Sequence, residues 1–178
     1  MIEWVCPECG LDYGTLTADA LPLRAEPLPG RWRGTLGGLD DVRLRRRPTP
    51  TTWSPIEYAA HTRDVVADLR ATLLAMLGRG PMPSPGDPDE VVLERRYAEA
   101  DLAEVLDSLE AETDALVAFL RGVTAEEAVV EHEFEWGRRD LLTIAGNAVH
   151  EHTHHLFDVE RILAGSGGAG IGDGPTPA

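Results

Sequence analysis

Three long segments of this 178-residue chain carry apolar residues at the three- and four-residue spacing of an amphipathic α-helix. They cover residues 55 to about 77, 101 to about 120, and 140 to about 163. A shorter helix is expected near residues 28–39, and only residues 129–136 alternate as a short extended piece would. Helices with one apolar stripe bury it best against each other, which predicts an all-α, antiparallel four-helix bundle.

The start signals of these helices are specific. Ser54 is suited to the N-cap, Pro55 to the first helical position, and Glu57 to the third, which together form a capping box. Asp101 and Asp140 can cap the two later helices in the same way. Residues 78–88 hold four prolines and three glycines and are expected to form a loop between two helices.

The two ends of the chain differ from its middle. Residues 1–30 contain Cys6-Pro-Glu-Cys9-Gly10 and three further prolines, so we expect a small irregular knuckle and strap packed on the bundle. Residues 31–164 are assigned to the bundle itself. Residues 165–178 are rich in glycine and are expected to form a flexible tail.

Charge limits the classes of partner. The chain has 31 acidic residues against 16 basic ones, all of them arginine, and a formal net charge of −15. Such a charge repels phosphate backbones and anionic lipid, so we expect neither nucleic acid nor membrane as a partner. No basic leader or long apolar run is present, which predicts a cytoplasmic protein. A small-molecule substrate is expected, and homodimerisation stays open.

The chemistry-bearing residues gather in the last predicted helix. Four of the six histidines fall within six consecutive positions: His150, His152, His154 and His155. With Glu151 between them, two pairs at i,i+4 spacing overlap, His150 with His154 and Glu151 with His155. On a helical wheel Glu151 and His155 lie at the edge of the apolar stripe, whereas His150 and His154 point away from it. His152 faces the core, where a hydrogen-bonded buried imidazole is the simpler interpretation.

His61 lies at the apolar edge of the helix that begins at residue 55. Beside Glu151 and His155 it would complete three inward ligands with a fourth position free, as in a catalytic metal site. The alternative is that His61 is an interfacial histidine and Glu151 a solvated charge. Asp158 could accept a hydrogen bond from a ligand imidazole, or pair with Arg161. For His132 we favour a surface position.

Two motifs resemble those of a known family. Trp53-Ser-Pro-Ile-Glu-Tyr-Ala-Ala-His61 and Glu151-x-x-x-His155-x-x-Asp158 are similar to signatures of the DinB/YfiT-like superfamily, over about residues 30–164. Many members have histidine where Glu151 stands, whereas the mycothiol-dependent maleylpyruvate isomerases resemble this chain in having glutamate. His150 and His154 also fit the histidine-rich form of the motif, so they are alternative ligands to join His61. The wheel favours Glu151 and His155.

The resemblance implies a four-helix bundle that binds one divalent transition metal, zinc or nickel, and in several branches the transfer of a low-molecular-weight thiol. A metal of this kind lowers the pKa of a bound thiol or water. The leading hypothesis is therefore an enzyme that activates a mycothiol-like thiol, or a water, for S-transfer to a small electrophile or for its isomerisation. A zinc-stabilised binding or stress-response module without turnover, and a zinc store or sensor, are the alternatives.

The only two cysteines, Cys6 and Cys9, supply half of a tetrahedral zinc site. The outward-facing His150 and His154 have a spacing suited to the other half. We therefore expect a structural zinc to clamp the N-terminal knuckle onto the last helix, leaving Glu151 and His155 for the other site. An all-cysteine site shared across a dimer, a redox-active thiol pair, and cysteines that merely pack near the surface remain alternatives.

Overall fold

The computed structural model describes residues 4–165, and its secondary structure is mainly helical. In chain order the elements are η1 (Tyr13–Thr15), α1 (Ala20–Ala25), α2 (Leu28–Leu36), α3 (Asp41–Arg45), α4 (Pro55–Met76), α5 (Pro88–Glu94), η2 (Tyr97–Glu99), α6 (Leu102–Arg121), α7 (Ala125–Ala128), β1 (Glu131–Phe134), β2 (Gly137–Asp140) and α8 (Leu141–Leu163).

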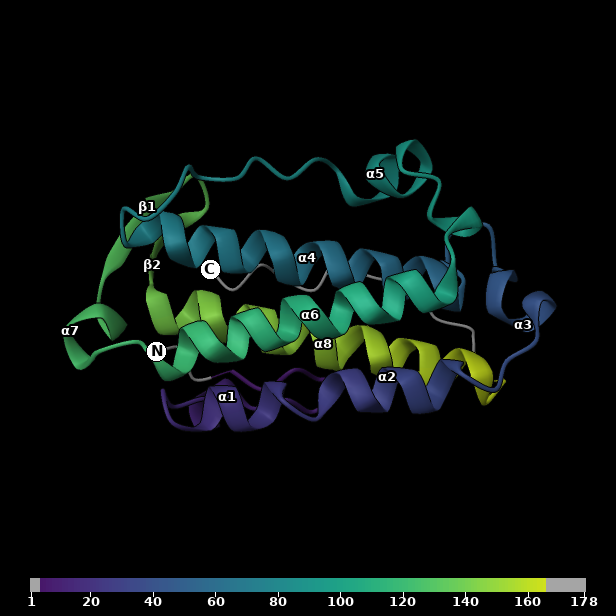
Figure 1. Ribbon diagram of the computed structural model, residues 1–178, viewed down its shortest axis with the longest axis horizontal. Coiled ribbons are helices and arrows are strands. Elements are labelled where there is room, and N and C mark those ends of the chain that lie inside the picture. The colour runs from purple at the N-terminus through teal and green to yellow at the C-terminus, as the bar shows by residue number, and fades with distance from the viewer. Residues whose placement is uncertain (1–3, 166–178) are drawn as a thin grey trace.

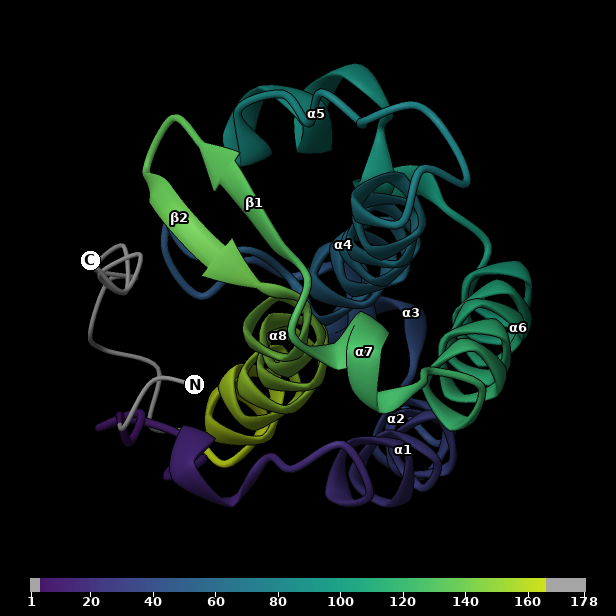
Figure 2. The same cartoon turned by 90° about the vertical axis from the view of Figure 1, so that its left-hand side faces the viewer.

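Four rods of helix lie side by side along the long axis of the molecule (Figure 1). Helix α4 packs against both α6 and α8, while α1 and α2 follow each other end to end and pack against α6 and α8. Seen from the end, the four rods surround a common centre (Figure 2). The four-helix bundle expected from the apolar spacing is therefore confirmed, with a small β-hairpin added to it.

The helix starts follow the local sequence signals. At the start of α4 the Ser54 backbone N–H and hydroxyl donate to Glu57 Oε2 over 2.8 and 2.7 Å, and Asp140 accepts from the Thr143 N–H over 2.7 Å at the start of α8. Between the rods lies one apolar core whose largest fully buried members include Trp32, Ile56, Leu73, Leu109, Leu116, Leu141 and Ile144.

The N-terminal region contains more helix than its prolines led us to expect. Helix α1 forms in spite of Pro22, because that proline occupies the first turn, where its missing N–H would have no partner in the helix. Helix α2 runs through residues 30 and 31, between which the domain boundary was predicted. Of the predicted tail at 165–178, all but Gly165 lies outside the described residues.

The expected extended piece at 129–136 is one strand of a hairpin. Strand β1 pairs antiparallel with β2, with His132 opposite Arg139, and Gly137 begins β2 with a φ of 107°. The second strand, Gly-Arg-Arg-Asp, lacks apolar alternation and was not predicted. Among the described residues no helix is both long and apolar enough to cross a membrane.

Candidate metal centres

Helices α4 and α8 bring together His61, Glu151 and His155, with one ligand-type atom of each within 4.8 Å of the others. Glu151 and His155 lie one turn apart on α8, and Glu151 Oε2 is 3.1 Å from His155 Nε2. The rings of His61 and His155 meet edge to face across the helix interface, with centroids 5.0 Å apart. These are the three residues that the helical wheel placed at the apolar edges.

Aromatic rings close one side of this cluster. The Trp53 ring lies 4.8 Å from that of His61, and the Tyr58 ring 5.3 Å from that of His155. Both histidines are about nine-tenths buried, whereas the Glu151 side chain is 34% exposed. The cluster is therefore dry at the imidazoles and open to solvent at the carboxylate.

The protonation states within the cluster differ. Burial, helped by the nearby His155, lowers the pKa of His61 to about 4, so this imidazole is neutral at pH 7 with a free lone pair. Burial opposes ionisation of Glu151, but the adjacent His155 imidazole outweighs it and lowers the pKa of the carboxyl group. Burial also opposes protonation of His155, yet Asp158 and Glu151 raise its pKa above the ordinary value. Without a metal, His155 thus carries a proton between two carboxylates.

Asp158 lies behind the cluster, buried on α8. Its Oδ2 is 3.3 Å from His155 Nδ1 and 3.5 Å from His154 Nε2. Its other oxygen is 3.9 Å from Arg161 Nη1, so the carboxylate is close to both kinds of partner considered from the sequence. Accepting the Nδ1 proton leaves His155 Nε2 to face Glu151.

His155 Nε2 is buried and has no aligned hydrogen-bond partner among the described residues, although Glu151 Oε2 is only 3.1 Å away. A buried polar atom of this kind calls for an explanation. Two imidazole nitrogens and a carboxylate oxygen that converge in this way are a suitable ligand set for a divalent transition metal. The residues of this cluster therefore fit the metal that the family resemblance implies.

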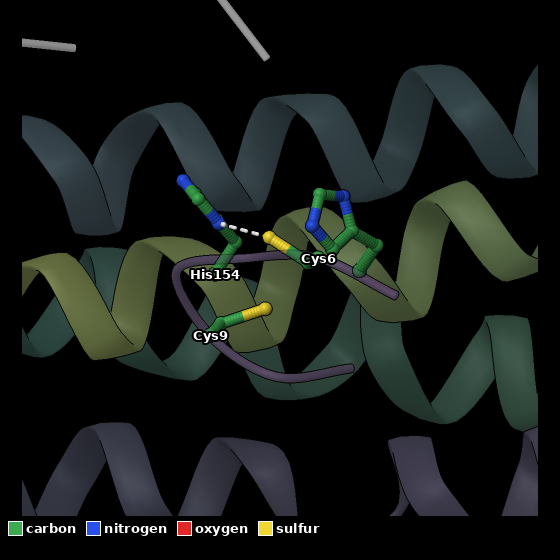
Figure 3. Close-up of side chains that lie close together, drawn as sticks. Cys6, Cys9 and His154 are labelled. Atoms are coloured by element: carbon green, nitrogen blue, oxygen red, sulfur yellow. Dashed lines mark hydrogen bonds between the residues drawn. The ribbon is translucent and has the colours of Figure 1, made fainter. Parts of the chain in front are cut away.

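A second cluster joins the N-terminal loop to α8. Cys6, Cys9, His150 and His154 each have a ligand-type atom within 4.8 Å of the others, and Cys6 Sγ lies 3.5 Å from His154 Nδ1. Figure 3 shows the loop crossing α8, with the sulfur atom of Cys6 directed at His154. Both cysteines are free thiols. Burial raises the pKa of Cys9 to about 12, and burial lowers the pKa of His150 to about 4.

The remaining histidines belong to neither cluster. His152 is buried beside Trp32, with ring centroids 6.3 Å apart, but its Nε2 has no hydrogen-bond partner among the described residues. His152 therefore lies in the core, as expected, but the hydrogen bond expected for a buried imidazole is not observed at its Nε2. His132 is exposed on β1, as expected.

Glu8 was not singled out in the sequence, yet its carboxylate lies 4.0 Å from His154 Nε2 and 3.2 Å from Arg161 Nη1. Its position between Cys6 and Cys9 was the available signal. A separate cavity of about 330 Å³ is lined by Arg43, Arg46, Pro48, Ile162, Leu163 and Gly165. None of these residues belongs to either cluster.

Comparison with known proteins supports the fold. A solved structure of YfiT from Bacillus subtilis, described as a probable metal-dependent hydrolase with an unusual four-helix bundle topology, is similar with a TM-score of 0.73. The two share 17% sequence identity over 92% of this chain and 93% of that one, which supports a common fold. No curated protein gives a significant sequence match. A sequence profile described as the DinB superfamily matches residues 26–159, three quarters of the chain, and the protein therefore belongs to the DinB superfamily.

Proposed function

We propose that this protein is a metal-dependent enzyme in which His61, Glu151 and His155 bind one divalent transition metal, with zinc the first candidate and nickel the second. The observation that carries the proposal is the convergence of their three ligand-type atoms within 4.8 Å, with both imidazoles buried. Three protein ligands are typical of catalytic metal sites, because they leave a coordination position for a substrate or a nucleophile.

The surrounding residues have separable tasks in this proposal. Asp158 holds the proton at Nδ1 of His155, which presents the Nε2 lone pair to the shared position. Burial keeps His61 neutral and ready to ligate. Trp53 and Tyr58 exclude water from the imidazole side, so a small molecule would approach from the partly exposed side of Glu151. A bound metal would supply the lowered pKa that lets a thiol or a water act as nucleophile at neutral pH.

For the nucleophile we propose a low-molecular-weight thiol similar to mycothiol, and for the reaction its transfer to a small electrophile or the isomerisation of that electrophile. Glutamate at position 151, rather than histidine, supports this choice through the resemblance to mycothiol-dependent isomerases. The similar Bacillus protein is described as a probable hydrolase, so water is the competing nucleophile that an experiment must separate.

The test compares His61→Ala with His132→Ala, a matched control at an exposed histidine that is outside both clusters. Metal per chain is counted by elemental mass spectrometry on tag-free protein, and circular dichroism checks that both variants are folded. We expect His61→Ala to lose one metal per chain and His132→Ala to lose none. Equal metal content in the two folded variants would overturn the site.

Turnover is then measured with a chromogenic electrophile, with and without mycothiol. We expect thiol-dependent product from the wild type and the His132→Ala variant, and a fall to the uncatalysed rate in His61→Ala. Equal product formation without thiol would show that water, and not the thiol, is the nucleophile. A metal-loaded wild type without turnover in either assay would count against the enzyme and in favour of a binding module.

A further inference from the structure

The loop that carries Cys6 and Cys9 is built to hold its thiols together. The backbone N–H of Cys6 donates to Leu11 O over 2.8 Å, and that of Gly10 donates to Cys6 O over 2.9 Å. Gly10 has a φ of 73°, a backbone conformation that glycine adopts without steric cost. The chain therefore reverses tightly just after Cys9.

The facing surface is the side of α8 that points away from the bundle core. His150 and His154 lie there one turn apart, and the loop covers them until their side chains are only 13% and 17% exposed. His150 Nε2 is buried without a hydrogen-bond partner among the residues that the structure describes. A buried imidazole nitrogen without a partner, on a residue that clusters with two thiols, calls for an explanation.

We propose that Cys6, Cys9, His150 and His154 form a second metal site, which binds a structural zinc and clamps the N-terminal loop onto α8. Two thiolates and two imidazoles are a complete tetrahedral zinc set, with no position left for a substrate. Tetrahedral zinc holds a sulfur and a nitrogen ligand about 3.6 Å apart. Cys6 Sγ and His154 Nδ1 are already 3.5 Å apart.

This site is distinct from the one proposed for catalysis. It shares no ligand with His61, Glu151 and His155. His154 and His155 are neighbours in sequence, but their rings lie 5.7 Å apart at 76° to each other and belong to different clusters. Each site can therefore be emptied without removing a ligand of the other.

The loop also makes contacts that need no metal. Arg161 pairs with Glu8 over 3.2 Å at the surface, and the Trp4 ring lies 5.5 Å from the ring of His150. A surface pair of this kind contributes little to stability. Further along the chain, Tyr13 docks on α8 by burial and donates from its hydroxyl to Asn147 Oδ1 over 2.9 Å. A zinc at the cysteines would thus add a further link between the loop and α8 to these contacts.

The experiment counts metal per chain in tag-free wild type, Cys9→Ser, His154→Ala and Glu8→Gln. We expect two metals in the wild type and one in each of Cys9→Ser and His154→Ala. Glu8→Gln should keep two, because Glu8 is next to the site without belonging to the four-ligand set. Co²⁺ reconstitution provides a second readout. A thiolate-to-cobalt charge-transfer band is expected in the wild type, Glu8→Gln and His61→Ala, and is expected to disappear in Cys9→Ser.

Three outcomes would overturn the second site. Unchanged metal content in Cys9→Ser would exclude ligation by the thiols. Loss of metal in Cys9→Ser but not in His154→Ala, in a protein that dimerises, would favour an all-cysteine site between two chains. Purification with a Cys6–Cys9 disulfide and no bound metal would favour a redox pair. Since His61→Ala empties only the other site, failure of either metal site is visible separately.

Discussion

Replacing Glu57 by glutamine should destabilise the protein strongly at neutral pH and hardly at all in acid. Glu57 is 3% exposed and lies in the first turn of α4, one turn before His61. Its carboxylate accepts from Arg47 Nη2 over 2.7 Å and Nε over 2.9 Å, and from both the backbone and the hydroxyl of Ser54. Glutamine keeps the shape but loses the charge and one acceptor oxygen.

The expected loss of stability depends on which hydrogen bonds Arg47 and Ser54 can still make after the substitution. Removing one member of a fully buried ion pair costs about 3–5 kcal/mol. Arg47 is 31% exposed, so its guanidinium can recover water, and the remaining amide oxygen can still accept from Ser54. A hydrogen bond to a charged group contributes about 1.5–3 kcal/mol. We therefore expect Glu57→Gln to lower the free energy of unfolding by about 2 kcal/mol at pH 7.

The pH dependence supplies the sharper test. Burial alone would raise the pKa of Glu57, but Arg47 and Ser54 lower it below the ordinary value in the folded state. A carboxyl group with a lowered folded pKa stabilises the protein fully above its unfolded pKa of about 4.3. That contribution disappears as the pH falls through the folded value. The gap between wild type and Glu57→Gln should therefore be constant near pH 7 and close below about pH 4.

Urea unfolding followed by circular dichroism measures this gap, at equal metal loading, from pH 7 down to the lowest pH at which both proteins fold. Glu127→Gln is the matched control, because Glu127 belongs to a second capping box, with Thr124, and pairs with Arg79 at the surface. Glu127→Gln should lower the free energy of unfolding much less than Glu57→Gln does. A Glu57→Gln gap that is absent at pH 7, or that persists unchanged in acid, would refute the reasoning.

Two further predictions concern α8 and its metal. Asp140→Ala removes the acceptor for the Thr143 N–H and should lower the free energy of unfolding by about 1 kcal/mol, measured by urea unfolding; no change would show that water replaces this cap. Metal binding at His155 must displace a proton, because Asp158 and Glu151 outweigh burial and raise its pKa. In the Cys9→Ser background, zinc affinity measured against a colorimetric chelator should therefore weaken about tenfold per pH unit between pH 8 and 6, and a flat profile would contradict the raised pKa.

Much of the candidate site could be predicted because it lies on long helices. Over α4 and α8 the helical period relates residue number to direction, so periodicity alone separates Glu151 and His155 from His150 and His154. His61 follows from the same reasoning on α4. What periodicity cannot supply is the path of a loop. It therefore missed that Glu8 would lie 4.0 Å from His154.

The fold, too, could be predicted where nearby residues determine the structure, and could not where packing or strand pairing does. The starts of α4 and α8 could be predicted because they depend on nearby residues in the sequence, namely the capping residues Ser54 and Asp140. Helix α1 was missed because Pro22 is a helix breaker everywhere except in a first turn, and its place in the turn depends on how the segment packs. Strand β2 was missed because a solvated two-stranded hairpin needs no apolar alternation; its partner strand supplies the hydrogen bonds.

The contact between Cys6 and His154 spans 148 positions in the chain. A ribosome makes a chain from its N-terminus, so the knuckle emerges before α8 and has no docking surface until α8 has been synthesised. Closing so long a loop is slow compared with forming the helices themselves. The knuckle, although it is made before α8, should thus be among the last segments to take its place, and during that interval its two thiols would be open to oxidation or to stray metal ions in the cell.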